Sequence, residues 1–364
     1  IFMRDAGFNR GMGGSMHAFF TPFGAYPNNA IVGGSAGIAV GAALRAQLTR
    51  SNSICVANLG DGSTGCGLIW ESMNFAGMGQ FRNLWQPPFD RNPPVLFCFT
   101  NNFYAMGGQT RGETMAWDRL SRIGAGMSPA QLHAETVDGS NPLAVADAVA
   151  RKAEVLRAGE GPALLDIECY RYSGHSTTDT NAYRSRDEMK AWQAHDPITR
   201  FRDRLVDGGV IAAGEADEMV EAAGVQIEAV TRVVVNRQLA PAVDLEASPT
   251  IIGDMTFNNE AIELVGRAGD LLAEPAETGA VKSIMRKARS GIAEDGSQLS
   301  PMRAVTLRDA LSEAILHHLI HDESLIAYGE ECRDWGGAFG VHRGFADIIP
   351  VSYTHLRAHE TTLD

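Results

Sequence analysis

The stretch "LGDGSTGCG", residues 59–67, decides how the first half of this chain folds. It follows the apolar run "ICVANL" (54–59), which predicts a buried strand that leads into a glycine-rich turn. Gly60, Gly62 and Gly65 fit G-x-G-x-x-G, the fingerprint of a dinucleotide-binding turn. Asp61, however, places a carboxylate where a bare diphosphate would approach, and like charges repel. The stretch therefore predicts a strand, turn and helix, and leaves the ligand open.

Outward from this turn, short apolar runs alternate with helical patterns between about residues 30 and 240. The expected strands are "ICVANLG" (54–60), "PVLFCFTNN" (94–102) and "ALLDIECYRY" (163–172). The expected helices are "CGLIWESMNFAGMGQ" (66–80) and "PLAVADAVARKAEVLRAG" (142–159). Such alternation predicts an α/β fold, a parallel sheet with helices on both faces.

Three further regions complete the expected organisation. Gly33, Gly37 and Gly41 share one helix face, a spacing typical of close helix packing. Residues 205–238 read as amphipathic helix, and 240–302 as a linker or irregular extension. A second α/β domain then begins, with the helix "VTLRDALSEAILHHLI" (305–320), capped by Thr306, and the strand "SLIAYGEE" (324–331).

Composition excludes several classes of protein. The 31 basic and 44 acidic residues give a formal net charge of −13, which disfavours nucleic-acid partners. The five cysteines are widely spaced with no C-x-x-C pair, so we expect free thiols and no structural zinc. The longest apolar stretch, "IVGGSAGIAVGAAL" (31–44), is too short to span a bilayer. We expect a cytoplasmic protein.

The aspartate in the turn favours a metal over a plain dinucleotide site. A nicotinamide-binding fold needs an acid at the end of the next strand, but that strand ends in Asn101 and Asn102. Magnesium prefers hard oxygen ligands, which an Asp and an Asn from two adjacent strand ends can supply. A cation on Asp61 would then bind a diphosphate, assisted by backbone N–H groups at the helix N-terminus.

The order of these motifs adds a family resemblance. G-D-G (60–62) followed by N-N (101–102) resembles the thiamine-diphosphate motif. The chain is similar to the α subunit of the decarboxylating component of 2-oxo acid dehydrogenase complexes, of the pyruvate and branched-chain type. The matching stretches are "GMGGSMH" (11–17), "NNAIVGGSAGIAVGAAL" (28–44), "NNFYAMGGQT" (101–110), "VDGSN" (137–141), "YRYSGHSTTD" (170–179) and "YRSRDE" (183–188). Residues 305–345 resemble the start of the β subunit.

This resemblance implies a domain layout. Residues 1–238 would form the thiamine-diphosphate-binding fold, without its N-terminal part, and 239–302 a linker. Residues 303–350 would begin a transketolase-like pyrimidine-binding α/β domain, as if two subunits were fused. Residues 351–364 match nothing in the family, and whether they are native stays open. We therefore expect a chain truncated at both ends.

The resemblance also assigns roles to single residues. Asp61 and Asn102 would bind Mg²⁺ through their side chains, and Tyr104 through its carbonyl. Gly62 and Ser63 would contact the diphosphate, together with His175 and Arg171. The backbone of Ala30 and Val32 would hold the aminopyrimidine, and Glu330 would belong to the proton path. Without the family resemblance, a plain surface position explains His175, Arg184 and Arg186 as well as a functional role does. Asn101 and Tyr104 are then explained equally well as turn residues.

The implied reaction is the oxidative decarboxylation of a 2-oxo acid, with acyl transfer to the lipoyl group of a partner acyltransferase. The cofactors would be thiamine diphosphate and Mg²⁺, and the assembly a homodimer of fused chains. The alternatives are an acetoin-cleaving enzyme, a nicotinamide dehydrogenase, and an inactive fragment or scaffold subunit. The activating glutamate and the rest of the β domain are absent, so we expect no turnover by this chain alone. The stretch "QFRNLWQPPFDRNPP" (80–94) lengthens the interval from Asp61 to Asn102, but as a proline-rich loop it should leave the fold intact and add a surface contact.

Overall fold

The structure is a computed structural model, and it describes most of the chain. The described residues are 2–14, 16–27, 30–128, 132–177, 179–251, 271–287, 289–301, 304–322, 325–329, 332, 336–350 and 356–357. The chain divides into two compact units. The first comprises Ile1–Met78 and Asn92–Asn258, and the second Gly79–Arg91 and Asn259–Asp364.

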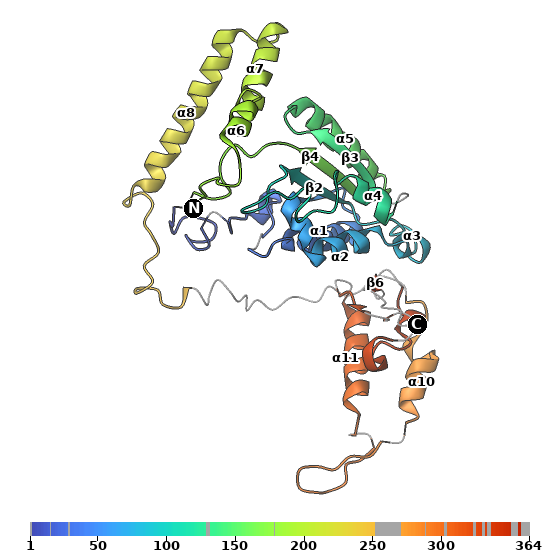
Figure 1. Ribbon diagram of the computed structural model, residues 1–364. Coiled ribbons are helices and arrows are strands. Elements are labelled where there is room, and N and C mark those ends of the chain that lie inside the picture. The colour runs from blue at the N-terminus through green and yellow to red at the C-terminus, as the bar shows by residue number, and fades with distance from the viewer. Residues whose placement is uncertain are drawn as a thin grey trace. The chain divides into compact units, whose positions relative to one another are not determined.

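A four-stranded parallel sheet forms the centre of the first unit (Figure 1). Its strands are β1 (Cys55–Gly60), β2 (Val95–Asn101), β3 (His133–Asp138) and β4 (Ala163–Glu168), in the spatial order β1-β2-β4-β3. The predicted parallel sheet is confirmed. The sequence analysis missed β3, because this edge strand pairs only with β4 and most of its residues are half-buried, so it lacks a continuous apolar run.

Helices cover both faces of this sheet, as predicted. On one face α1 (Gly34–Leu48), α2 (Gly67–Gly77) and α4 (Arg122–Met127) contribute to a core that includes Leu59, Phe97 and Phe99. On the other face α5 (Pro142–Arg157) packs over Leu96, Cys98 and Leu165. Alternate residues of β2 therefore point into two different cores, which explains its continuous apolar sequence.

The predicted glycine packing holds for two of its three residues. Gly33 starts α1 with a φ of 83°, and a Cβ there would lie 3.2 Å from Cγ1 of Ile69 in α2. Gly37 also faces α2, whereas Gly41 faces open space. Close approach of α1 and α2 therefore requires glycine at Gly33, where both the backbone conformation and the neighbour exclude a side chain.

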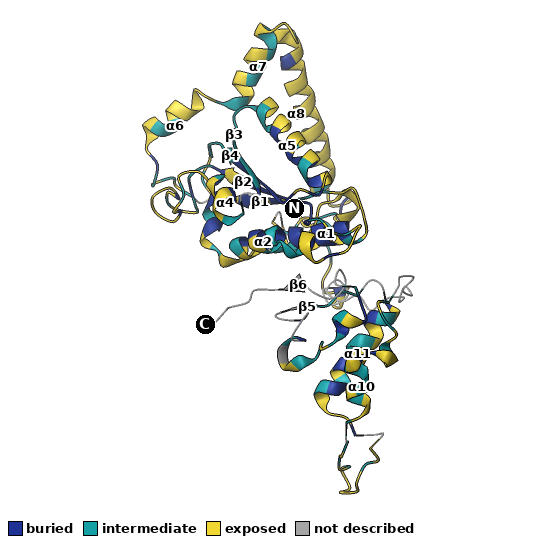
Figure 2. Cartoon of the chain, turned by 90° about the vertical axis from the view of Figure 1, so that its right-hand side faces the viewer, coloured by how far each residue is buried: buried dark blue, intermediate teal, exposed yellow. Residues whose placement is uncertain are grey.

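The C-terminal part of the first unit is helical and exposed. The helices are α6 (Arg186–Gln193), α7 (Pro197–Asp207) and α8 (Ala213–Val235). The single amphipathic region predicted for 205–238 is instead two helices, since α7 ends at Gly208 and Gly209 has a φ of 65°. Most residues of α8 are exposed (Figure 2).

In the second unit, α10 (Gly279–Met285) and α11 (Leu307–His321) pack around Leu319, Phe345, Ile348 and Ile349. Thr306 caps α11 by accepting from Asp309 N at 3.2 Å, as predicted. Within the expected strand 324–331, of which residues 325–329 are described, Tyr328–Gly329 form β5, paired with β6 (Leu356–Arg357). Helix α10 lies inside the expected linker, and α3 (Gln80–Asn83) inside the expected loop 80–94.

Short 3₁₀ turns connect these elements: η1 (Thr21–Phe23), η2 (Asp61–Gly65), η3 (Pro275–Glu277), η4 (Ala338–Gly340) and η5 (Phe345–Asp347). All five cysteines are free thiols, as expected. Within the described ranges, no helix is long and apolar enough to cross a membrane.

Candidate functional site

Asp61 and Asn102, two of the predicted site residues, meet at the carboxyl ends of β1 and β2. Gly60 pairs with Thr100 in the sheet, so Asp61 and Asn101 leave neighbouring strands side by side. Asp61 Oδ1 accepts a hydrogen bond from Asn102 N at 3.3 Å. The carboxyl edge of parallel strands is where ligands bind in open α/β sheets. The two halves of the sequence motif, 41 residues apart, are therefore in direct contact.

Asp61 is a buried carboxylate that forms no ion pair with any described residue. Its other oxygen, Oδ2, accepts a hydrogen bond from the Thr110 hydroxyl. Burial raises the pKa of Asp61, while Thr110, Asn102 and the charge of Arg171 counteract part of that rise. A buried charge without a close partner is costly, and a cation bound to the carboxylate would offset this cost.

The segment that follows β2 is a tight hairpin. Asn102 Oδ1 accepts from Tyr104 N at 3.0 Å, and Phe103 between them has a φ of 62°. Thr110 N donates to Phe103 O at 2.9 Å, which returns the chain beside Asp61. The hairpin therefore joins Asn102 to Asp61 through its backbone N–H, while the Asn102 side-chain oxygen holds Tyr104 N.

One glycine of the G-x-G-x-x-G turn, Gly62, lies tightly against the hairpin. A Cβ on Gly62 would lie 3.2 Å from the Cβ of Ala105 in the hairpin, whereas Gly60 and Gly65 face open space. Ser63 is buried, and its hydroxyl donates to Gly60 O at 2.5 Å. The turn therefore packs closely against the hairpin, and the backbone of Gly62 and Ser63 leads directly into α2.

Arg171 joins the segment after β4 to the same hairpin. Its guanidinium donates to Ala105 O at 3.1 Å, Tyr104 O at 3.5 Å and the Tyr183 hydroxyl at 2.6 Å. Its Nε atom is buried without a hydrogen-bond partner. The structure thus brings Arg171 to Tyr104 and places a positive charge near Asp61. A cation in this position is suited to an anionic ligand.

Arg184 is a buried residue, so the interpretation of it as a surface charge is wrong. It donates to the carbonyl oxygens of Arg171 and Ser173, the latter at 2.9 Å, and to the side chain of Asn181. Its guanidinium lies over three tyrosine rings at 5.3–5.6 Å from their centres: Tyr104, Tyr170 and Tyr183. Arg184 therefore fixes the segment that carries Arg171 and His175. Arg186 is exposed at the start of α6.

The model of one protein family, the dehydrogenase E1 component, matches residues 1–242. This chain belongs to that family. It is 33% identical over 224 residues to the pyruvate dehydrogenase E1 component subunit alpha type I of Ascaris suum, covering 61% of this chain and 52% of that protein. It is also 35% identical over 208 residues to the pyruvate dehydrogenase E1 component subunit alpha of Zymomonas mobilis. These residues cover 57% of this chain and 54% of that protein.

A third relative is the pyruvate dehydrogenase E1 component subunit alpha of Dictyostelium discoideum, 32% identical over 247 residues. These residues cover 67% of this chain and 60% of that protein. The chain thus spans between 52% and 60% of these three relatives. The family match ends at residue 242, so the β-like part beyond it stays a prediction.

The remaining predicted site residues have fewer contacts with the segment around Asp61 and Asn102. Ala30 and Val32 lie on the exposed turn before α1, which Gly33 holds near Cys66 at the start of α2. His175 is exposed, and only its backbone N–H bonds, to Asp179 Oδ2 at 2.7 Å. The described residues give its ring no hydrogen bond. Glu330 lies outside the described residues.

The sequence analysis missed several side chains that hold the segments of the candidate site together. Asp166 in β4 is fully buried and accepts from Asn101 Nδ2 at 2.9 Å, Leu120 N at 2.8 Å and Thr136 Oγ1 at 3.1 Å. Glu188 accepts from the Tyr104 hydroxyl at 2.6 Å. A signal existed for Asp166, because an acid inside the apolar run "ALLDIE" must be partnered when buried. Thr110 and Glu188 carry no comparable signal.

The loop that carries His175 should respond to acid. The Tyr183 hydroxyl, with the N–H groups of Asn181 and His175, lowers the pKa of Asp179 to about 2. A carboxyl with a lowered pKa stabilises the folded loop above its ordinary pKa, and this contribution is lost as pH falls through the folded value. We therefore expect the loop to stay ordered at pH 4 and to loosen toward pH 2.

Pepsin, which is active in this range, provides the measurement. Cleavage within residues 172–183, mapped by mass spectrometry, should be slow at pH 4 in the wild type and fast in Asp179→Asn. Asp207→Asn, at the exposed end of α7, is the control and should behave as wild type. Equal cleavage of all three proteins at pH 4 would show that Asp179 does not order the loop.

Proposed function

We propose that this chain is part of a thiamine-diphosphate-dependent 2-oxo acid dehydrogenase, the component that decarboxylates the 2-oxo acid. The observation that supports this best is the contact of Asp61 with Asn102 beside the Tyr104 backbone, in a chain of the dehydrogenase E1 family. The relatives carry the name pyruvate dehydrogenase, so pyruvate is the substrate to test first.

The residues of the site fit Mg²⁺ and a diphosphate. Their donor set is a carboxylate, an amide oxygen and a backbone carbonyl, the hard oxygen ligands that Mg²⁺ prefers. We propose Asp61, Asn102 and Tyr104 as these ligands. The described residues hold no group of three or more His, Cys, Asp or Glu side chains that would favour a softer metal.

The remaining residues would bind and orient the cofactor. The backbone N–H groups of Gly62 and Ser63, in the turn η2 that precedes α2, are suited to diphosphate oxygens. Arg171 and His175 would add positive charge or hydrogen bonds on the same group. Thiamine diphosphate supplies, when bound, the nucleophilic carbon and the electron sink that decarboxylation requires. We propose that Ala30 and Val32 hold its pyrimidine ring and that Glu330 serves proton transfer.

The assembly proposed for the working enzyme is larger than this chain. A partner acyltransferase would accept the acyl group on its lipoyl group, and two chains would form a homodimer that resembles an α2β2 tetramer. Residues 303–350 would contribute the start of the pyrimidine-binding domain. Because the activating glutamate was not found in the sequence, we expect no turnover of a 2-oxo acid by this chain alone, measured with a dye acceptor.

Titration calorimetry tests the proposal on the chain itself. We expect weak binding of thiamine diphosphate in the presence of Mg²⁺, and no binding once a chelator removes the metal, because the diphosphate and Asp61 repel each other without a cation. NADH should not bind. Binding of NADH without metal would support a nicotinamide enzyme instead, and binding of thiamine diphosphate that ignores the chelator would contradict the metal site.

A further inference from the structure

Helix α8 exposes far more apolar surface than a helix of a folded domain usually does. Ala216 is its only buried residue, although the helix runs from Ala213 to Val235. Val220 is 67% exposed, Ile227 68% and Val230 62%. Figure 2 shows the same helix coloured almost entirely as exposed. Contiguous apolar surface of this kind typically marks an interface with another protein.

The apolar residues of α8 follow the repeat of a coiled coil. Six of them succeed one another at intervals of four, three, four, three and four positions: Ala216, Val220, Ala223, Ile227, Val230 and Val234. Alternating intervals of three and four place all six on one narrow stripe of a helix. At the two ends of the stripe Ala216 is buried and Val234 is half-buried, whereas the four residues between them are exposed.

The stripe is symmetric about position 225. Reversing its direction superimposes Ala223 on Ile227, Val220 on Val230 and Ala216 on Val234. In an antiparallel pair of two such helices, each small alanine would therefore face a larger branched residue. A parallel pair would place alanine against alanine and isoleucine against isoleucine, which fills the layers unevenly. The pattern fits a second copy of itself, in the antiparallel direction.

The charges of α8 favour the same arrangement. Its N-terminal half carries four acids, Glu215, Asp217, Glu218 and Glu221. Its C-terminal half carries Glu228 and Arg232, which pair with each other at 2.6 Å, and Arg237 follows the helix. Asp217 already pairs with Arg202 of α7 at 2.7 Å, so parallel helices would place the three other acids of one copy beside those of the second. Antiparallel helices place the acidic half of one copy beside the half that contains the arginines, which removes this repulsion.

We propose that α8 is a dimerisation helix that pairs with α8 of a second copy of this chain, antiparallel, through the exposed part of the stripe from Val220 to Val230. This adds a contact surface to the homodimer of the proposed function and rests on that homodimer, whereas its test does not depend on the cofactor site. The pair is isologous, so one two-fold axis near position 225 relates the two copies. Small residues at the centre, Ala223 and Gly224, allow the helix axes to approach closely there.

A pair of matched variants tests the proposal in the full chain. Ile227 and Val225 are β-branched, similarly exposed (68% and 61%) and two positions apart, but lie on opposite faces of α8. We expect the wild type to dimerise in sedimentation equilibrium and Val225→Glu to do the same. Ile227→Glu should raise the dimer dissociation constant at least ~30-fold, because it buries an unpaired charge in the seam.

Circular dichroism checks that both variants fold, since both side chains are exposed in the single chain. A wild type that stays monomeric at high concentration overturns the proposal, as does equal behaviour of the two glutamate variants. Cross-linking then tests the direction. Chains with Ala223→Cys should form a disulfide with chains carrying Ile227→Cys, while neither should cross-link to itself. Self-linking of Ala223→Cys would show a parallel pair and overturn the antiparallel arrangement.

Discussion

Replacing Asp61 by Asn should abolish magnesium-dependent binding of thiamine diphosphate and leave the metal-free protein at least as stable as the wild type. We expect the affinity to fall at least about 100-fold, or ~2.7 kcal/mol, because the charged ligand of the metal is lost. The two effects point in opposite directions. Together they separate a ligand from a residue that only supports the fold.

The geometry around Asp61 explains why the fold should tolerate an amide in place of the carboxylate. The amide would keep its oxygen toward Asn102 N, and its NH₂ group would face the Thr110 hydroxyl, which can accept as well as donate. Both hydrogen bonds therefore survive. The substitution also removes a buried charge that forms no ion pair in the described part of the chain, so we expect a gain of on the order of 1 kcal/mol or no change.

The pH dependence of stability gives a second measurement on the same pair of proteins. Burial raises the pKa of Asp61, so the folded chain binds this proton more tightly than the unfolded chain does. Stability of the metal-free wild type should therefore rise as pH falls through the raised folded pKa toward the ordinary pKa of an aspartate. Asp61→Asn should lack this part of the rise, measured by denaturant unfolding at several pH values.

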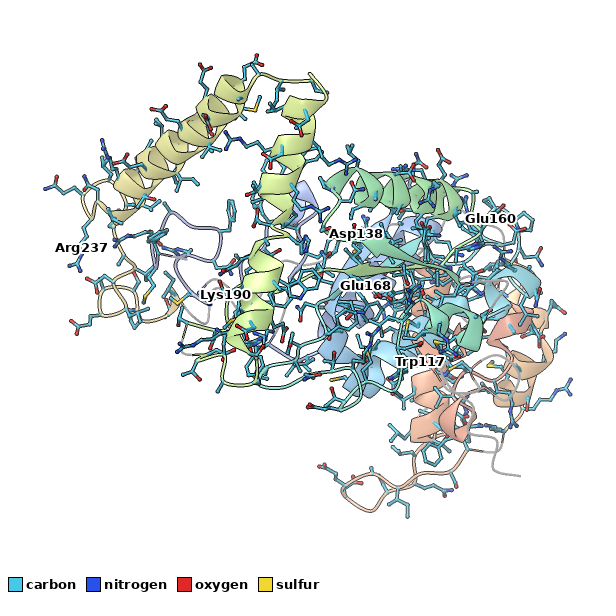
Figure 3. All side chains as sticks on the ribbon, turned by 45° about the horizontal axis from the view of Figure 1, so that its top comes forward. Trp117, Asp138, Glu160, Glu168, Lys190 and Arg237 are labelled. Atoms are coloured by element: carbon cyan, nitrogen blue, oxygen red, sulfur yellow. The ribbon has the colours of Figure 1, made fainter. Side chains whose placement is uncertain are left out.

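Asp138→Asn is the matched control. Asp138 also ends a strand at the carboxyl edge of the sheet (Figure 3), but it is exposed and accepts from the backbone N–H and hydroxyl of Ser140. This variant should bind the cofactor as the wild type does. If Asp61→Asn kept magnesium-dependent binding, or if Asp138→Asn lost it to the same degree, Asp61 would not be the metal ligand.

The sequence predicted the part of the site that local chemistry determines. A buried apolar strand must end in a turn, and the Gly-Asp-Gly sequence that follows the strand identifies this turn as a ligand-binding one from residue types alone. Asn102 could be joined to Asp61 because parallel strands bring their carboxyl ends to one edge. The contact at 3.3 Å confirms that they meet.

The supporting contacts could not be predicted in the same way, because each depends on a partner distant in the sequence. Arg184 looks like any charged loop residue until its three carbonyl and amide acceptors surround it. Thr110 lies 49 positions from Asp61, and no periodicity links them. Strand β3 lies at the edge of the sheet beside β4, so it is less buried and its sequence lacks the continuous apolar run that identifies a central strand. Tertiary contacts decided these features.

Replacing Asp166 by Ala should destabilise the first unit by about 3–5 kcal/mol, the largest effect on folding that we expect. Asp166 is fully buried in β4 and ties together three segments: the end of β2 through Asn101, the turn before α4 through Leu120, and β3 through Thr136. Alanine would leave these buried donors without an acceptor. Denaturant unfolding against wild type measures the loss.

Asp118→Ala provides the contrast. Asp118 pairs with Arg122 at 2.8 Å, but both side chains are more than half exposed, and such surface pairs contribute between 0 and about 1 kcal/mol. Loss of similar size in the two variants would mean that the buried network adds nothing beyond a surface ion pair.

Asp166 should also affect the site through Asn101, even where the variant still folds. A carboxylate can only accept, so Asn101 must turn its NH₂ group toward Asp166 and its oxygen toward Phe103 N, at 3.3 Å. Phe103 is the residue with positive φ that sets the hairpin of Asn102 and Tyr104. Asp166→Asn removes this constraint on Asn101 without changing the size of the side chain. Hydrogen exchange at the Phe103 amide should therefore accelerate at least ~10-fold more than exchange in the centre of β2, since a lost local bond exposes that amide first. Uniform acceleration throughout the sheet would instead assign Asp166 a role in global stability alone.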